Sequence, residues 1–160
     1  MKPSRSSVSG FTLTELMVVV AVAGILTVIA IPSFTSLVQS QRVKNAGFEL
    51  YSSLALARNE AIKRNSDVTL AATMNASNEV SWVITADDGT VIRNQGFIKD
   101  IAFEVTGLPG TEVVYRRNGR PASTATFEID VLGAAAPTPF VRCLTIELSG
   151  MPRIRMGACS

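Results

Sequence analysis

The polarity of the chain changes sharply after residue 10. Residues 11–31 are almost entirely apolar, and Glu15 is the only charged side chain among them. A helix needs about 20 apolar residues to cross the hydrocarbon core of a bilayer. We therefore predict that residues 11–31 form a transmembrane helix, or the core of a filament built from such helices.

A second helical pattern occupies residues 32–66. Its apolar positions recur at steps of three and four residues, the spacing of one face of an amphipathic helix; they include Phe34, Leu37, Val38, Ala46, Leu50, Leu54, Ala57 and Ala61. Pro32 lacks a backbone donor and is expected to kink the helix. The polar run at residues 65–67 is expected to end it. The prediction is one long helix whose amphipathic second half packs against the rest of the protein.

From residue 68 onward, short alternating runs replace the helical spacing. We predict strands over residues 68–74, 80–85, 90–93, 101–105, 113–117, 126–131, 140–148 and 153–156. The last two are expected to pair as a hairpin, and residues 87–89 and 118–119 carry hairpin-turn signals. The aromatic side chains of Trp82, Phe97, Phe103 and Phe127 are expected in the core. The predicted fold is α+β, with the long helix against a β-rich head of residues 67–160.

Charge and cysteine content narrow the class further. Lys2 and Arg5 account for the formal net charge of +2, and without residues 1–10 the basic and acidic residues balance. Bulk charge therefore gives no argument for a nucleic-acid partner. In an exported domain, Cys143 and Cys159 predict a disulfide, and free thiols are the alternative. A disulfide would close a loop of about 15 residues and stabilise the head by about 3 kcal/mol.

Catalysis has little support in the sequence. The chain contains no histidine, the usual base for a serine or cysteine nucleophile. Two cysteines without histidine supply only half of a zinc ligand set. Asp87 and Asp88 precede a glycine and fit turn chemistry better than a metal site or a carboxylate pair. We predict a protein that is not an enzyme and uses no cofactor or metal.

The N-terminal segment differs in order from a secretory signal. A secretory signal ends in a cleavage site after its apolar stretch. Here the leader, which carries Lys2 and Arg5, ends at Gly10, and the apolar run follows it. Cleavage after Gly10 would remove the leader, residues 1–10, and leave the helix on the mature protein. A signal anchor that is not cleaved is the alternative.

Residues 10–16, Gly-Phe-Thr-Leu-Thr-Glu-Leu, closely resemble the processing site of type IV prepilins and type II secretion pseudopilins. The resemblance implies that prepilin peptidase cuts after Gly10 and methylates the new N-terminal residue, Phe11. It also makes Glu15 the assembly residue. A lone carboxylate in hydrocarbon is costly unless it is paired, and the N-terminal amine of a neighbouring pilin subunit would pair with Glu15.

The head has a second resemblance. Asn118-Gly119-Arg120-Pro121, the segment 142–146, Ser149-Gly150 and the segment 153–155 are similar to the GspH/FimT group of minor pilins and pseudopilins. Some members of the FimT branch bind DNA during natural transformation through arginines in a C-terminal Gly-Arg-x-Arg pattern. The chain departs from that pattern, because Met151 and Pro152 stand between Gly150 and Arg153.

The C-terminal arginines are the candidate DNA-binding residues. Arg153 and Arg155 alternate with apolar residues, so in a strand both would leave the same face. Arg142 shares parity with Leu144 and Ile146 and should either exit at the strand end or be partly buried. A guanidinium group can hold a phosphate by two hydrogen bonds. A few such contacts would bind double-stranded DNA weakly, without base specificity and with strong salt dependence.

Other interpretations of the arginines stay open. They could protect an edge strand against aggregation, pair with acids such as Glu128 and Asp130, or contact proteins at a filament tip. Weaker candidates for DNA contacts lie near the turn at residues 118–119: Arg116, Arg117 and Arg120.

The features together favour a minor type IV pilin of the GspH/FimT type. Its helix would sit in the bacterial inner membrane with the head in the periplasm, and it would assemble with other pilin subunits into a pilus. DNA capture for natural transformation is the expected task. The alternatives are a structural pseudopilin of a type II secretion system and a minor pilin that only primes pilus assembly.

Overall fold

The computed structural model describes residues 11–108, 110–134 and 137–159, without the side chains of residues 29–33. The predicted leader, residues 1–10, lies outside the described residues. Two compact units, Met1–Val38 and Gln39–Ser160, share one helix, α1 (Leu13–Arg64). Pro32 lies within α1 and does not end it; the expected kink stays a prediction. Among the described residues, no helix is both long enough and apolar enough to cross a membrane.

The C-terminal end of α1 has a well-defined cap. Asn65 takes a left-handed conformation with φ 53°, and its N–H donates to the carbonyl of Ile62 at 3.3 Å. The N–H of Ser66 donates to the carbonyl of Ala61 at 3.3 Å. These two bonds form a Schellman motif, which satisfies carbonyls that have no partner inside the helix. The polar run at residues 65–67 therefore ends the helix as predicted.

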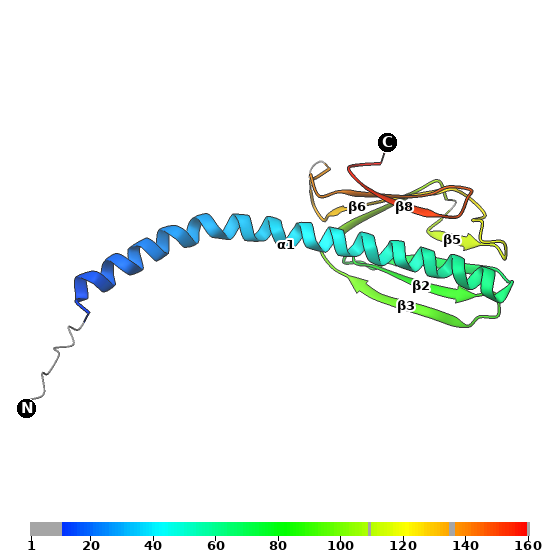
Figure 1. Ribbon diagram of the computed structural model, residues 1–160, viewed down its shortest axis with the longest axis horizontal. Coiled ribbons are helices and arrows are strands. Elements are labelled where there is room, and N and C mark those ends of the chain that lie inside the picture. The colour runs from blue at the N-terminus through cyan, green and yellow to red at the C-terminus, as the bar shows by residue number, and fades with distance from the viewer. Residues whose placement is uncertain (1–10, 109, 135–136, 160) are drawn as a thin grey trace, which may run out of the picture. The chain divides into compact units, whose positions relative to one another are not determined.

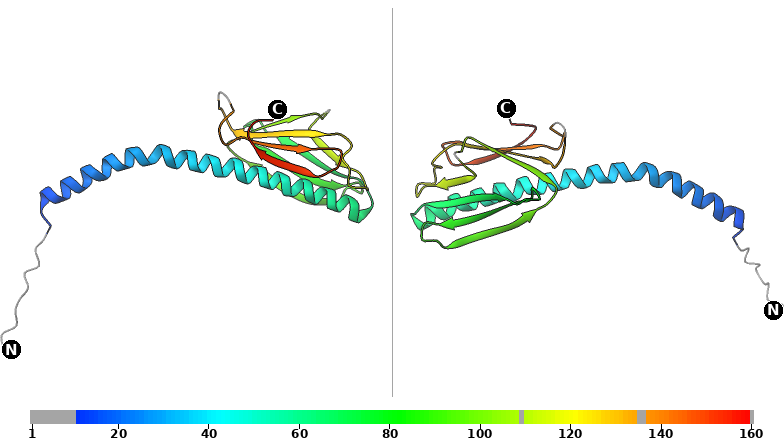
Figure 2. Two further views of the ribbon diagram at one scale, coloured as in Figure 1. Left: turned by 45° about the horizontal axis from the view of Figure 1, so that its top comes forward. Right: turned by 180° about the vertical axis from the view of Figure 1, so that it is seen from behind.

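Two antiparallel sheets make up the head. The first has the order β3-β2-β1-β5 and the second the order β4-β6-β7-β8. The strand bounds are β1 (Val68–Met74), β2 (Val80–Ala86), β3 (Val91–Ile98), β4 (Ile101–Thr106), β5 (Glu112–Tyr115), β6 (Ala125–Val131), β7 (Arg142–Ile146) and β8 (Pro152–Met156). Figure 1 shows the second half of α1 crossing both sheets, with β2 and β3 on one side and β6 and β8 on the other. The right-hand view of Figure 2 shows the same arrangement from behind.

The core lies where α1 meets the two sheets. The helix buries apolar side chains at three- and four-residue steps, namely Val43, Ala46, Leu50, Leu54, Ala57 and Ala61. The rings of Trp82 and Phe103 are stacked, with centroids 6.4 Å apart. The rings of Phe103 and Phe127 are tilted, with centroids 5.8 Å apart. The indole Nε1 of Trp82 donates to the buried hydroxyl of Ser53 at 2.9 Å. These contacts join both sheets to the helix.

One prediction about the core was wrong: Phe97 is half exposed on the edge strand β3 and does not belong to the core. The predicted turn at Asn118-Gly119 closes a short hairpin, through the bridge Tyr115↔Pro121 and the bond from the N–H of Ala122 to the carbonyl of Val114 at 2.8 Å. This hairpin does not pair β5 with β6, which lie in different sheets. A turn motif fixes local backbone geometry, whereas pairing also depends on which face each strand can bury.

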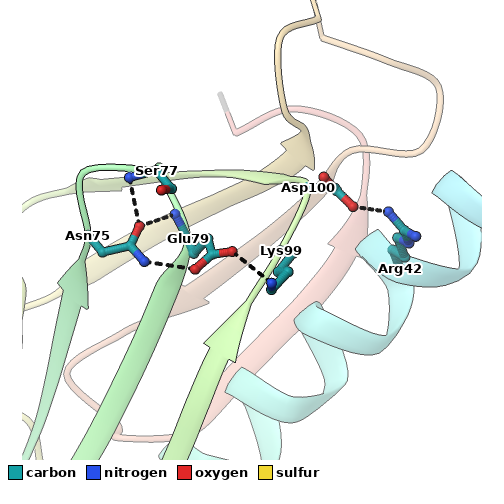
Figure 3. Close-up of polar contacts among 6 residues, drawn as sticks. All are labelled: Arg42, Asn75, Ser77, Glu79, Lys99 and Asp100. Atoms are coloured by element: carbon teal, nitrogen blue, oxygen red, sulfur yellow. Dashed lines mark hydrogen bonds and ion pairs between the residues drawn. The ribbon is translucent and has the colours of Figure 1, made fainter.

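Polar contacts fix the connections at one end of the head (Figure 3). The side chain Oδ1 of Asn75 accepts the N–H groups of Ser77 and Glu79, each at 2.9 Å. Glu79 also lies 3.5 Å from Nζ of Lys99. Next to Lys99, Asp100 forms an ion pair with Arg42 of α1. The β1–β2 turn and the β3–β4 connection are thereby linked, and the latter is tied to the helix.

Candidate functional site

The predicted assembly residue, Glu15, closes a hydrogen-bonded ring at the start of α1. Thr12 is the N-cap residue, and its backbone N–H and hydroxyl donate to Oε2 of Glu15 at 3.0 and 2.7 Å. In return, the N–H of Glu15 donates to the hydroxyl of Thr12 at 3.3 Å. This is a capping box, whose Thr-x-x-Glu signature can be read from the sequence. That signature at residues 12–15 could have predicted a partner for Glu15 within its own helix.

The predicted DNA-binding arginines lie on the hairpin β7–β8. In the antiparallel register, Arg153 is opposite Thr145, Arg155 is opposite Cys143, and Arg142 is opposite Met156. Paired residues share a face and successive residues alternate. Arg153 and Arg155 therefore leave the same face and are exposed, as predicted.

Arg142 lies on the other face of the sheet. It is half buried, on the side occupied by Leu144 and Ile146, and its Nη1 donates to the carbonyls of Phe140 and Val141 at 3.0 and 3.3 Å. The structure thus brings two of the three arginines together on one face. The partial burial expected for Arg142 is found.

Acidic side chains modify this surface. Nη1 of Arg153 lies 3.6 Å from a carboxylate oxygen of Glu147, and both side chains are exposed. On the same face of the sheet, Glu104 and Glu128 are directly opposite each other on β4 and β6. Glu128 accepts the N–H of Cys159 at 2.7 Å. The exposed face is therefore basic along β8 and acidic toward β4.

The disulfide Cys143–Cys159 is formed, as predicted. It joins β7 to the C-terminal tail across a separation of 16 residues. Because Cys143 is the cross-strand neighbour of Arg155, the tail is attached close to the basic strand.

Reducing this disulfide should lower the free energy of unfolding by about 3 kcal/mol, because the cross-link restricts the unfolded chain. The measurement is urea denaturation of the full chain in a neutral detergent, with and without dithiothreitol. The double variant Cys143→Ser, Cys159→Ser should unfold at the same midpoint under both conditions. Coincident curves for the oxidised and reduced wild-type chain would contradict the expected contribution.

Two motif glycines have a structural role. A Cβ on Gly119 would lie 2.6 Å from Cδ1 of Ile62, and a Cβ on Gly150 would lie 2.0 Å from the carbonyl oxygen of Gly119. Nε of Arg58 donates to that same carbonyl oxygen at 3.0 Å. The turns at residues 118–119 and 149–150 are therefore packed on each other and on the end of α1.

The weaker candidates Arg116, Arg117 and Arg120 are exposed around the first of these turns. Backbone bonds define the turn: the N–H of Arg116 donates to the carbonyl of Arg120 at 2.9 Å. The N–H of Arg117 donates to Oδ1 of Asp67 at 3.3 Å. None of the three belongs to the hairpin that carries Arg153 and Arg155.

Three groups with shifted pKa values lie away from the candidate DNA-binding arginines Arg142, Arg153 and Arg155. The hydrogen bond from Arg64 lowers the pKa of Glu60 at the end of α1. The hydrogen bond from the backbone of Thr90 lowers the pKa of Asp88, which supports its assignment to turn chemistry. Burial raises the pKa of Tyr115, whose hydroxyl has no hydrogen-bond partner within the described part of the chain.

Residues 46–150 match the family described as Type II transport protein GspH. The chain belongs to this family. Residues 5–31 also match the prokaryotic N-terminal methylation motif. A search of curated proteins gives no match. The resemblance to the GspH/FimT group is thereby confirmed.

Solved structures support the same fold for this GspH-family chain. The type IV minor pilin FimU of Pseudomonas aeruginosa is similar with a TM-score of 0.56 and 20% identity, over 74% of this chain and 90% of FimU. The minor pseudopilin EpsH of Vibrio cholerae is similar with a TM-score of 0.56 and 14% identity, over 76% of this chain and 98% of EpsH. At such identities the likeness shows the fold alone.

The GspH family and the methylation motif together identify the chain as a minor pilin or pseudopilin. Proteins of this kind are anchored in the inner membrane and assemble with other pilin subunits. Glu15 lies inside the methylation motif, and its role in assembly stays a prediction.

Proposed function

We propose that the chain is a minor pilin of a type IV pilus that captures double-stranded DNA for natural transformation, without base specificity. It would be a binding protein and not an enzyme. Prepilin peptidase would cleave after Gly10 and methylate Phe11. Residues 11–31 would cross the inner membrane once, with the head in the periplasm.

The observation that carries this proposal is the pair of exposed arginines on β8. Arg153 and Arg155 lie two residues apart on one face of an edge strand. Each guanidinium group can hold a phosphate through two hydrogen bonds. Both arginines lie on a strand and not on a helix that could enter the major groove, so the expected contacts are with the DNA backbone. Glu147 beside Arg153 would weaken these phosphate contacts, so we expect the affinity for DNA to be low.

The test is a titration of the full chain, in a neutral detergent, with labelled double-stranded DNA at low and at physiological salt. The double variant Arg153→Ala, Arg155→Ala should lose most of the affinity. For this variant, the plot of log association constant against log salt concentration should have a slope less steep by about 2, because two phosphate contacts are gone. Glu147→Gln should bind more tightly, since it removes the carboxylate next to Arg153.

The matched control is Arg116→Ala, Arg117→Ala, which removes the same charge from another exposed site. Equal losses in the two double variants would mean that the affinity comes from diffuse charge and not from β8. Absence of binding at low salt by the folded, oxidised chain would contradict the proposed DNA capture.

A structural pseudopilin of a type II secretion system is the second candidate. The family description favours it, and the TM-score to the pseudopilin EpsH equals that to the pilin FimU. Genes of a secretion system beside the gene for this chain, together with no DNA binding, would favour this candidate. Genes of other minor pilins without DNA binding would favour a role in priming pilus assembly.

A further inference from the structure

A groove of about 370 Å³ runs between α1 and the edge strand β8. Lys44 and Phe48 of α1 form one wall, and Arg142, Ile154, Arg155 and Met156 form the other. All of these residues lie within the unit Gln39–Ser160. The groove therefore combines side chains from the middle of the chain with side chains from its C-terminal end.

Gly47 lies where the β7–β8 hairpin comes closest to this part of α1. A Cβ at this position would lie 2.9 Å from Cδ1 of Ile154 and 3.6 Å from Cβ of Arg142. The absence of a side chain lets the β7–β8 hairpin approach the helix closely. Lys44 and Phe48, on the neighbouring turns of α1, then stand beside the hairpin.

The groove is positively charged. Lys44, Arg142 and Arg155 line it, and no acidic side chain does so among the described residues. The two carbonyl bonds to Nη1 of Arg142 hold its guanidinium group in place. Arg155 borders the groove at the edge of the sheet, because its side chain leaves the opposite face of β8 together with Arg153. An anion is the ligand that such a lining complements.

The apolar part of the groove distinguishes between kinds of anion. The side chain of Phe48 is 51% exposed and that of Met156 is 72% exposed, with Ile154 between the two elements. Proteins that bind single-stranded nucleic acid commonly stack a base on an aromatic ring and hold its phosphate with nearby cations. The bases of an intact duplex are stacked inside the helix, so a side chain in a groove of this protein cannot reach their faces.

We propose that this groove binds an unpaired nucleotide of a DNA strand, such as one at a frayed end. The phosphate lies between Lys44 and Arg142, with Arg155 at the edge of the groove, and the base lies over Phe48. This inference rests on the proposed DNA binding and adds to it. The arginines of β8 would hold the duplex backbone, and the groove would hold the end of a strand.

The test compares a labelled single strand with the blunt duplex made from it, each titrated against the full chain in a neutral detergent at one salt concentration. Phe48→Leu keeps an apolar side chain and removes the aromatic face. It should weaken single-strand binding by about fivefold or more and leave duplex binding unchanged. Lys44→Gln should weaken single-strand binding more than duplex binding.

The chain offers matched controls. Phe97 has the same exposed fraction as Phe48, 51%, but lies on β3, so Phe97→Leu should change neither affinity. Lys63→Gln removes another exposed charge from α1. Equal effects of Phe48→Leu and Phe97→Leu would overturn the groove proposal. So would unchanged single-strand binding by Phe48→Leu.

These outcomes separate the two proposals. Duplex binding that depends on Arg153 and Arg155, together with single-strand binding that does not depend on Phe48, would overturn the groove and leave the proposed function standing. Absence of any DNA binding by the wild-type chain would contradict both the proposed function and the groove proposal. A detergent effect is excluded by repeating the single-strand titration in nanodiscs of zwitterionic lipid, where the same effect of Phe48→Leu is required.

Discussion

Gly150→Ala is expected to lower the free energy of unfolding of the head by about 3–5 kcal/mol. The residue has a φ of +79°, a conformation that costs an alanine about 1–2 kcal/mol. The new Cβ would also lie 2.0 Å from the carbonyl oxygen of Gly119, which is a backbone atom and cannot rotate away. Separation of the two turns would weaken the bond from Arg58 to that oxygen.

The measurement is urea denaturation of the full chain in a neutral detergent, and Gly89→Ala is the matched control. Gly89 has a φ of +82°, but nothing lies within 4 Å of the position of its added Cβ. It should show the cost of the dihedral angle alone, about 1–2 kcal/mol. Equal losses in the two variants would show that the close approach of Gly150 to Gly119 does not stabilise the head.

Features set by local spacing could be predicted from the sequence. The apolar steps from Ala46 to Ala61 identified the buried face of α1, because one face of a helix repeats every three or four residues. The alternation around Arg153 and Arg155 placed both on one face of a strand. The turn at residues 87–89 closes between β2 and β3, where the N–H of Gly89 donates to the carbonyl of Ala86 at 2.9 Å.

Features set by long-range packing could not be predicted. The division of the strands into two sheets depends on where α1 lies. The turn motif at Asn118-Gly119 carries no information about the position of the helix. Phe97 was assigned to the core because it is aromatic, but it lies on the edge strand β3, whose exposure does not alternate regularly. Register shifts between β2 and β3 interrupt that alternation.

The candidate site shows the same division. Arg153 and Arg155 were found because they are near each other in sequence. Lys44 and Phe48 were missed as lining residues of the same groove as Arg142, because the sequence says nothing of which face of α1 meets β8. The small residue Gly47 marks the approach, but a glycine within a helix has several explanations. The motif residue Gly150 was read as a mark of the DNA-binding pattern, and the structure gives it a packing role.

Glu15→Ala is expected to leave processing after Gly10 intact and to abolish incorporation into filaments. In the isolated chain the carboxylate is satisfied by Thr12 of its own helix. During assembly the start of α1 would enter an apolar bundle, where a charge is costly unless a neighbour neutralises it. The N-terminal amine of the adjacent subunit supplies the opposite charge. Alanine has nothing to pair with that amine, so the amine itself would be left buried and unpaired.

The measurement is the amount of the processed chain in sheared filaments relative to the amount in the membrane fraction. Glu15→Gln separates the two roles of the carboxylate, because glutamine can still close a capping box but carries no charge. If pairing with the amine matters, Gln and Ala should both fail to assemble. Normal assembly of Gln with failure of Ala would assign the effect to the cap formed with Thr12. Normal assembly of Ala would contradict both roles, and would leave the apolar surface of residues 11–28 as the determinant of stacking.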